Sequence, residues 1–315
     1  MKALRIVFMG TPDFAVGILD KLVQEKYSIV GVITAPDRPA GRGRKLNESA
    51  VKSYSVKNGL TVLQPTNLKS ESFLQELQEL KADLQIVVAF RMLPKAVWSM
   101  PRLGTFNLHA SLLPQYRGAA PINWAIINGE EKTGVTTFFI DEKIDTGAII
   151  LQAEAPIEKT DNVADLHDRL MELGAGLVVK TVERIAGGNL ETTPQPDMGD
   201  LKLAHKIHRE TCEIDWSKPL DDVYNFIRGL SPYPAAWTML QNGDQQLMTK
   251  IYSCNPQEEK HQWEAGTIQS TKKEMKVAVA GGFINLQEIQ LEGKRKMVVK
   301  DVLNGLNLDE NAKMT

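Results

Sequence analysis

Short apolar runs alternate with amphipathic segments over the first part of the chain. Continuous apolar runs of about four to eight residues are typical of parallel strands buried on both faces, and helical spacing separates them. Strands are expected at residues 4–9, 29–34, 61–63, 85–90, 104–109 and 134–140, and helices after Pro12, at 49–58 and 70–80, after Pro94 and at 121–128. This alternation predicts an α/β fold with an open, mostly parallel, Rossmann-like sheet.

A longer helical pattern follows these strands and ends the first predicted domain. Apolar side chains recur at helical spacing at Val163, Leu166, Leu170, Leu173, Leu177, Val178 and Val182, and the pattern ends at Gly187-Gly188. We therefore expect the first domain to span residues 1–188. Residues 189–204 contain Thr192-Thr193-Pro194-Gln195-Pro196 and no clear period, which is typical of a linker between domains.

The pattern changes in residues 205–315, where a second, smaller domain is expected. One helix is predicted at 220–228, and strands are predicted at 236–240, 247–252, 276–280 and 283–291. Asn242-Gly243 and Gly281-Gly282 have the composition of hairpin turns. The pattern predicts a β-barrel, and an oligonucleotide-binding (OB-like) barrel is one candidate.

Bulk composition is that of an ordinary globular protein. Hydrophobic residues make up 43% and charged residues 24% of the 315 residues, and the mean hydropathy is -0.23. No apolar run reaches the ~18 residues needed to cross a bilayer. Met1-Lys2-Ala3-Leu4-Arg5 leads directly into a strand-like run instead of a signal peptide, so we expect a cytoplasmic protein with no membrane segment.

The charge distribution points to one local basic segment. A formal net charge of -2 gives no support to a wholesale nucleic-acid binder, and from His205 onward 14 Lys and Arg face 15 Asp and Glu. Within residues 37–45, however, one anion stands among four cations, namely Arg38, Arg42, Arg44 and Lys45. A solvated loop and a contact with RNA phosphates are the two explanations of this segment.

The cysteines give no support to a disulfide framework or a thiolate zinc site, because Cys212 and Cys254 lie far apart with no C-x-x-C pattern. His205, His208 and Cys212 have the spacing of metal ligands on one helix face. An ordinary helix with cationic turns is the favoured explanation. We therefore expect no metal site.

Candidate chemistry lies where predicted strands end, because ligands in open α/β sheets collect at the carboxyl ends of the strands. Suggestive residues occupy 10–13, 90–94 and 106–118. The first of these, Gly10-Thr11-Pro12-Asp13, lacks the glycines of the G-x-G-x-x-G fingerprint. A nicotinamide enzyme is accordingly disfavoured.

Asn107, His109 and Asp145 form the candidate catalytic group. Strand alternation puts Asn107 and His109 on the same face, one an amide donor and the other an imidazole that can move protons. Asp145 follows the next strand, where a loop would bring its carboxylate to orient the His109 ring. Each residue also has an ordinary structural explanation: a backbone hydrogen bond for Asn107, a satisfied core histidine at 109, and a simple turn at Asp145-Thr146-Gly147.

One long motif carries a resemblance to a known family. Ser111-Leu112-Leu113-Pro114-Gln115-Tyr116-Arg117-Gly118-Ala119-Ala120-Pro121-Ile122 resembles a motif of the folate-dependent formyltransferases. Further matches in the first domain are Gly10-Thr11-Pro12-Asp13-Phe14, Pro36-Asp37-Arg38-Pro39-Ala40-Gly41-Arg42-Gly43, Gly134-Val135-Thr136 and Asp145-Thr146-Gly147. Ile214-Asp215-Trp216 and Pro232-Tyr233-Pro234-Ala235 resemble the C-terminal domain of members that act on tRNA.

The resemblance implies an activity and assigns residues to it. It implies transfer of the formyl group of 10-formyltetrahydrofolate to the methionine amino group of charged initiator tRNA, with no metal and no obligatory protein partner. By resemblance, Asn107, His109 and Asp145 are the catalytic residues. The folate site is expected at Ser111, Leu112, Leu113, Pro114, Met92 and Leu93, and the tRNA contact at Arg38, Arg42, Arg44 and Lys45.

Two other functions remain open at this point. The acceptor can instead be a nucleotide sugar or a small amine, although the basic segment argues against it. A noncatalytic RNA-binding protein on an α/β scaffold is the alternative from another class, and it leaves the candidate catalytic group unexplained. The chain also departs from the family pattern at Arg91, where glycine is usual, and the loop at 90–94 is one residue shorter.

Overall fold

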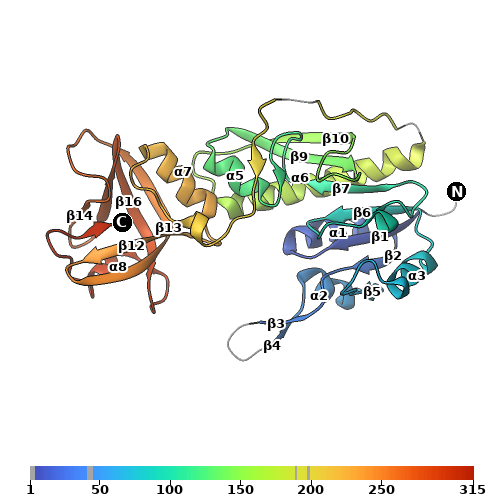
Figure 1. Ribbon diagram of the computed structural model, residues 1–315, viewed down its shortest axis with the longest axis horizontal. Helices are drawn as coiled ribbons and strands as arrows, with labels where there is room; N and C mark the ends of the chain where they lie inside the picture. The colour runs from blue at the N-terminus through green and yellow to red at the C-terminus, as the bar shows by residue number, and fades with distance from the viewer. Residues whose placement is uncertain (1–3, 41–44, 189, 197–198) are drawn as a thin grey trace. The chain divides into compact units, whose positions relative to one another are not determined.

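The computed structural model describes residues 4–40, 45–188, 190–196 and 199–315 (Figure 1). The chain divides into two compact units. The first unit comprises Met1–Gly118, Thr133–Ala155 and His167–Leu203, and the second comprises Ala119–Lys132, Pro156–Leu166 and Ala204–Thr315. Two segments from the middle of the chain therefore group with the C-terminal part. The domain boundaries at residues 188 and 205 stay a prediction.

The main sheet has the order β10-β9-β7-β6-β1-β2-β5 (Figure 1). Its strands are β1 (Arg5–Gly10), β2 (Ser28–Ile33), β5 (Val62–Leu63), β6 (Leu84–Val88), β7 (Thr105–His109), β9 (Lys132–Phe139) and β10 (Ile149–Pro156). From β5 to β7 all neighbours are parallel, whereas β9 runs antiparallel to β7. The predicted Rossmann-like α/β fold is confirmed. Strand β10 was not predicted from the apolar pattern, and within it only Ile150 and Ala155 are buried.

The helices around this sheet begin where the sequence indicates. They are α1 (Asp13–Gln24), α2 (Ala50–Lys57), α3 (Glu71–Glu79), α4 (Lys95–Trp98) and α6 (Val163–Gly187). Helix α2 is capped by Ser49, whose hydroxyl accepts a hydrogen bond from the Lys52 N–H at 3.0 Å. Helix α1 buries Phe14, Ile18 and Leu22 on one face, as the four-residue spacing predicts.

The basic segment contains a short antiparallel pair that the apolar pattern did not predict. Strand β3 (Arg38–Ala40) pairs with β4 (Lys45–Asn47), and Arg38 lies opposite Asn47. Asp37, just before the pair, accepts hydrogen bonds from Gln64 and Lys52, and these lower the pKa of its carboxyl group. Arg42 and Arg44 lie outside the described residues.

The second unit contains an antiparallel sheet in the order β14-β15-β16-β13-β12-β18, with β17 paired to β16. The strands are β12 (Ala236–Asn242), β13 (Gln245–Glu258), β14 (Ile268–Ser270), β15 (Met275–Val279), β16 (Gly282–Leu291), β17 (Met297–Val298) and β18 (Lys313–Met314). A bridge between Thr267 and Lys313 joins the two ends of this order. The predicted β-barrel is therefore confirmed, while the OB-like type stays a prediction.

Both predicted hairpin turns of the barrel occur one residue away from their expected place. Asn242 pairs with Gln245, so the turn residues are Gly243 and Asp244, and Gly243 has φ +57°. In the second hairpin Val279 pairs with Gly282 around Gly281, which has φ +93°. Asn242 and Gly282 remain in the strands because their backbone groups complete the ladders.

The remaining elements are mostly short. They are α5 (Pro121–Ile127), α7 (Leu220–Leu230), α8 (Val299–Leu303), the 3₁₀ helix η1 (Glu210–Cys212), and the strands β8 (Arg117–Gly118) and β11 (Leu203–Ala204). The segment from His205 to Cys212 is not one continuous helix, and the Cys212 thiol donates to the His208 carbonyl at 3.1 Å. Burial raises the pKa of the Cys254 thiol to about 12, so it is protonated at neutral pH.

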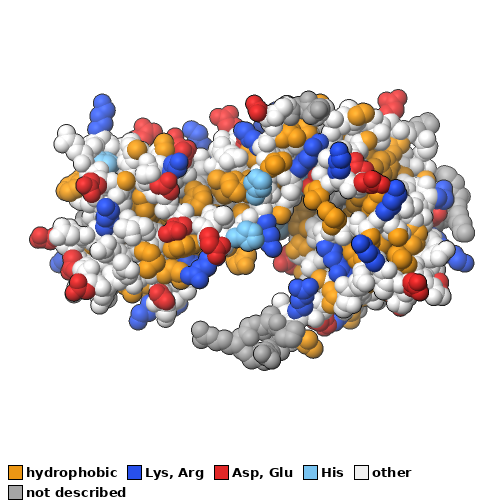
Figure 2. Space-filling view, in the orientation of Figure 1, with side chains coloured by type: hydrophobic (Ala, Val, Ile, Leu, Met, Phe, Trp, Pro, Cys, Tyr) orange, Lys and Arg blue, Asp and Glu red, His pale blue; other side chains and the backbone are white. Residues whose placement is uncertain are grey.

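Three properties of the described residues bear on the classes of function. They contain no group of three His, Cys, Asp or Glu arranged to hold a metal ion. In the same residues, no helix has both the length and the apolar character needed to cross a bilayer. On the face shown in Figure 2, Lys and Arg side chains of the second unit lie among Asp and Glu side chains.

The buried side chains of β7 contribute to the core of the first unit. Removal of one of them should therefore lower the free energy of unfolding. Phe106 is fully buried, and Phe106→Ala should lower the free energy of unfolding by about 3–5 kcal/mol because a cavity replaces the ring. Denaturant unfolding measures this loss. As a control, Val56→Ala should change stability by less than about 0.5 kcal/mol, because Val56 is 62% exposed in the folded protein. Equal losses for both variants would contradict the assignment of Phe106 to the core.

Candidate active site

Strand β7 carries Asn107 and His109 to the carboxyl end of the main sheet. Asn107 pairs with Val87 of β6 and with Phe138 of β9, and His109 lies opposite Thr136 of β9. Alternation along the strand puts both side chains on one face. No hydrogen bond joins the partly exposed Asn107 amide to another described residue, so the amide is left for a ligand. This removes the backbone-bond explanation of Asn107.

His109 is buried and held in one orientation. Its Nε2 lies 2.8 Å from the Tyr116 carbonyl oxygen, so this nitrogen carries a hydrogen and donates it. The other ring nitrogen, Nδ1, lies 3.9 Å from Asp145 Oδ2, which is an ion-pair distance but too long for a direct hydrogen bond. The structure therefore brings His109 and Asp145 together and leaves Nδ1 as the ring nitrogen that a reacting group can use.

Asp145 lies in the connection between β9 and β10. Its φ is +55°, a left-handed conformation that costs a residue with a side chain roughly 1–2 kcal/mol. One carboxylate oxygen, Oδ2, accepts a hydrogen bond from the Gly118 N–H at 3.0 Å. A side chain at Gly147 would have its Cβ 1.7 Å from the Phe139 carbonyl oxygen, so only glycine fits there. Asp145-Thr146-Gly147 is thus a turn, and the turn aims the carboxylate at His109.

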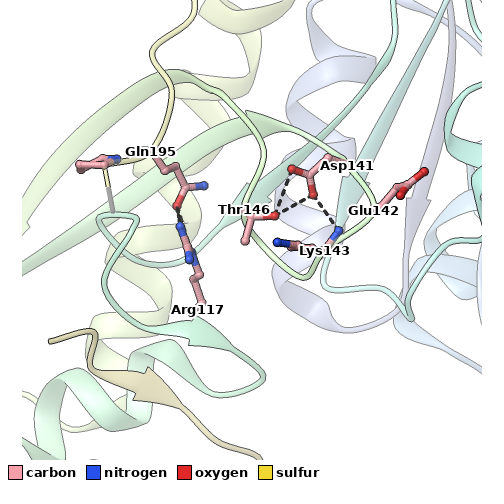
Figure 3. A pocket seen from close by; sticks show the side chains of 7 residues that line it. Arg117, Asp141, Glu142, Lys143, Thr146 and Gln195 are labelled. Atoms are coloured by element: carbon pink, nitrogen blue, oxygen red, sulfur yellow. Dashed lines mark hydrogen bonds between the residues drawn. The ribbon is translucent and has the colours of Figure 1, made fainter. Parts of the chain in front are cut away.

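Gln195 completes this region, although the sequence pattern assigned it to the linker. Its Nε2 donates to the carbonyl oxygens of Asp145 and Gly147, both at 2.9 Å. Its Oε1 accepts from Arg117 Nε at 3.1 Å and Nη2 at 2.6 Å (Figure 3). Thr193 also exchanges two backbone hydrogen bonds with Ile149, at 2.8 and 2.9 Å. Residues 193–195 of the predicted linker therefore make specific contacts with the segment between β9 and β10, and the linker assignment itself stays a prediction. Nothing in the local pattern marks Gln195, because its partners are distant in sequence.

A cleft of about 540 Å³ lies beside this turn (Figure 3). Charged and polar side chains line it, including Arg117, Asp141, Lys143, Thr146 and Gln195. Asp141 is tied into the loop, because it accepts hydrogen bonds from Thr146 Oγ1 at 2.8 Å and from the Lys143 N–H at 2.9 Å. Among the lining residues, Arg117 and Lys143 supply positive charge next to the Asp145 turn.

The segment predicted to contact folate, from Ser111 to Pro114, is held by hydrogen bonds to other parts of the protein. Thr136 Oγ1 donates to the Ser111 carbonyl at 2.7 Å and accepts from the Leu113 N–H at 3.1 Å and from Gln152 Nε2 at 2.9 Å. Ser111, Leu113 and Pro114 are buried, and Leu112 is partly exposed. Ser111 Oγ donates to the Gln115 carbonyl at 2.7 Å. These contacts explain a rigid loop and leave folate binding a prediction.

The other predicted ligand contacts have mixed surroundings. Met92 is 69% exposed, whereas Leu93 is buried in the core cluster with Val7, Met9 and Val97. Arg91, the departure from the family pattern, donates to the Pro65 and Thr66 carbonyls. Arg38 is exposed on β3, and Lys45 begins β4. The proposed tRNA contact therefore stays a prediction for all four cations.

Comparisons with known proteins identify the family to which the chain is similar. A family model described as "Formyl transferase" matches residues 4–182, and one described as "Formyl transferase, C-terminal domain" matches residues 206–307. Among its relatives, the chain is 60% identical to the methionyl-tRNA formyltransferase of Flavobacterium johnsoniae, with 100% of both chains covered. It is 54% identical to that of Bacteroides fragilis, with 99% of this chain and 98% of the relative covered.

Solved structures share the fold at low sequence identity. The N-formyltransferase from Helicobacter canadensis, in complex with folinic acid and dTDP-3-aminofucose, has a TM-score of 0.65 and 22% identity, covering 93% of this chain and 100% of that one. HypX from Aquifex aeolicus, in complex with tetrahydrofolic acid, has a TM-score of 0.66 and 18% identity, covering 98% of this chain and 49% of that one.

The buried Thr136 hydroxyl should be a main support of the loop after β7. Thr136→Val keeps the shape but leaves the Ser111 carbonyl and the Leu113 N–H without this partner, so stability should fall by about 1–3 kcal/mol. Thermal unfolding measures the change. The exposed Thr192 provides the matched control, and Thr192→Val should be nearly neutral. A Thr136→Val protein as stable as the parent would show that these hydrogen bonds contribute little.

Proposed function

The chain belongs to the formyl transferase family, and we infer that it transfers the formyl group of 10-formyltetrahydrofolate to the methionine amino group of charged initiator tRNA. The product is N-formylmethionyl-tRNA, which is used in translation initiation. The observation that carries this function is identity of 52–60% to methionyl-tRNA formyltransferases over 95% or more of either chain. The low-identity structures support the fold alone.

The proposed reaction begins with attack of the methionine amine on the formyl carbon. A C–N bond forms, and the carbonyl electrons move to oxygen to give a tetrahedral oxyanion. The Asn107 amide has no hydrogen bond to another described residue, which supports a role as one donor to this oxygen. His109 would be the other donor through Nδ1, because Nε2–H is committed to the Tyr116 carbonyl. In this role the ring acts as an imidazolium, since Nδ1 has no hydrogen in the neutral form set by that bond.

The intermediate then collapses. The bond between the formyl carbon and the folate nitrogen breaks, and its electron pair goes to that nitrogen, which takes up a proton. The attacking amine must lose a proton in the same sequence. Asp145 supports this transfer as a nearby carboxylate that orients His109 and accepts the amine proton, directly or through water. None of these steps needs a covalent enzyme intermediate.

The ligand contacts are proposed from the sequence. We assign the folate site to Ser111, Leu112, Leu113, Pro114, Met92 and Leu93, and the contact with the acceptor end of the tRNA to Arg38, Arg42, Arg44 and Lys45. Arg38 supports the second assignment, because it is exposed while neighbouring Asp37 is engaged by Gln64 and Lys52. The burial of Ser111, Leu113 and Pro114 supports a shaping role for most of the folate segment.

The domain roles follow the same proposal. Residues 1–188 would form the catalytic domain, and residues 205–315 a β-barrel that contacts tRNA, joined by residues 189–204. The two matching family models, at 4–182 and 206–307, are compatible with this division. We also propose a cytoplasmic location, because charged initiator tRNA is used there.

Asn107→Ala should remove one oxyanion donor and lower turnover by about 10²–10³-fold. Formylation of charged initiator methionyl-tRNA with 10-formyltetrahydrofolate measures this loss. Stability should be nearly unchanged, since no hydrogen bond joins the Asn107 side chain to another described residue. Asn311→Ala, at an exposed position, is the matched control. Near-parental turnover in Ala variants of Asn107, His109 and Asp145 would refute the catalytic assignment.

Arg42→Ala should raise the KM for tRNA without altering folate binding, because a phosphate contact is lost. Steady-state kinetics at several salt concentrations measure it, and the slope of log affinity against log salt should fall by nearly one. Lys69→Ala, an exposed cation elsewhere in the first unit, is the control. Unchanged tRNA kinetics for Arg42→Ala would count against the basic segment.

A small amine acceptor, which the sequence left open, is the second candidate. A dTDP-linked amino sugar offered in place of charged tRNA separates the two. Formylation of the sugar, with none of the tRNA, would favour this alternative.

A further inference from the structure

Gln195 uses its whole amide on the Asp145 turn and on Arg117. The two N–H groups of Nε2 donate to the carbonyls of Asp145 and Gly147. The two acceptor sites of Oε1 accept from Arg117 Nε and Nη2 (Figure 3). If the amide were flipped, its oxygen would face the Asp145 and Gly147 carbonyl oxygens, and its N–H groups would face the N–H groups of Arg117. Both arrangements are repulsive. The orientation of the amide is therefore determined by its partners.

The turn that Gln195 holds contains backbone conformations that need outside support. Asp145 is left-handed at φ +55°, and such a residue persists only where surrounding contacts over-determine it. At Gly147, two residues later, a Cβ would lie 1.7 Å from the Phe139 carbonyl oxygen, so only glycine fits there. The Gln195 amide spans the carbonyls of Asp145 and Gly147, so it sets the backbone on both sides of Thr146.

The position of this backbone decides where the Asp145 carboxylate lies. Asp145 Oδ2 is 3.9 Å from His109 Nδ1, and the same oxygen accepts the Gly118 N–H. Gly118 follows Arg117, whose guanidinium is bound by Gln195 Oε1. The Gln195 amide therefore acts on the carboxylate by two routes. It binds the backbone of the turn that carries Asp145, and it binds Arg117, the residue before the Gly118 N–H that donates to Asp145 Oδ2.

We propose that Gln195 is a positioning residue for the formyl transfer, which sets Asp145 against His109 through its hydrogen bonds to the Asp145 and Gly147 carbonyls. The proposal rests on the proposed function of this site. It makes the segment between the two predicted domains part of the active centre. Gln195 touches no reacting atom, and its effect passes through Asp145.

Gln195→Glu separates this role from a simple contact with Arg117. The carboxylate accepts the Arg117 hydrogen bonds at least as well as the amide, but it offers no N–H to the two carbonyls and repels them. We expect kcat to fall about 10²-fold, as for a misplacement of about 1 Å, while the KM for tRNA stays unchanged. The exposed neighbour Thr192→Ala should keep the parental kcat. Parental kcat in Gln195→Glu would overturn the proposal.

A double-mutant cycle tests whether Gln195 acts through Asp145. In an Asp145→Ala background, Gln195→Glu should cost little further turnover in a single-turnover assay, because the carboxylate to be positioned is gone. Losses that multiply in full would mean that Gln195 acts by another route and would overturn the proposal.

Hydrogen exchange gives a readout that does not depend on formyl transfer. Exchange across residues 141–148 should be faster in Gln195→Glu than in the parent and unchanged in Thr192→Ala. If the parent protein makes no formylmethionyl-tRNA, the proposed function fails, and this measurement still decides the positioning role. Unchanged exchange in Gln195→Glu would overturn it.

Discussion

The candidate site depends on the path of the connection between β9 and β10, because this connection carries Asp145 to His109. Because β9 runs antiparallel to β7, Phe139 lies opposite Phe106, three residues before His109. At about 3.3 Å per residue this is roughly 10 Å along the strand. Residues 140–145 must cover that distance to bring the Asp145 carboxylate to 3.9 Å from His109 Nδ1. The left-handed Asp145 and the absent side chain of Gly147 make this path possible.

Backbone groups in such a connection have no strand partner, so other parts of the chain must bind them. Buried carbonyl and N–H groups left without a partner cost roughly 1–3 kcal/mol each. The Gln195 amide binds the Asp145 and Gly147 carbonyls, and the Asp145 carboxylate binds the Gly118 N–H. Thr136 likewise supplies partners to backbone groups of the loop after β7, where it binds the Ser111 carbonyl and the Leu113 N–H. Polar side chains therefore build the scaffold of the site.

The two candidate catalytic side chains of β7 differ in how they are held. His109 is buried with Nε2 committed to the Tyr116 carbonyl, and Asn107 is partly exposed with its amide free among the described residues. A fixed ring beside an available amide is the arrangement expected of preorganised donors, which need little rearrangement as charge develops. In the second unit, the Thr267–Lys313 bridge joins the two ends of the antiparallel sheet. This closure protects the strand edges from pairing with other chains.

The sequence by itself determined the local elements and the shared face of Asn107 and His109. Apolar runs, helical spacing and capping residues such as Ser49 act over a few neighbouring residues, so they predict strands and helices directly. Only the tertiary structure decided which ring nitrogen of His109 is available, how Asp145 returns to it, and that Gln195 holds the turn. The Gln195 partners are 50, 48 and 78 residues away in the chain, and no local pattern records contacts of that range.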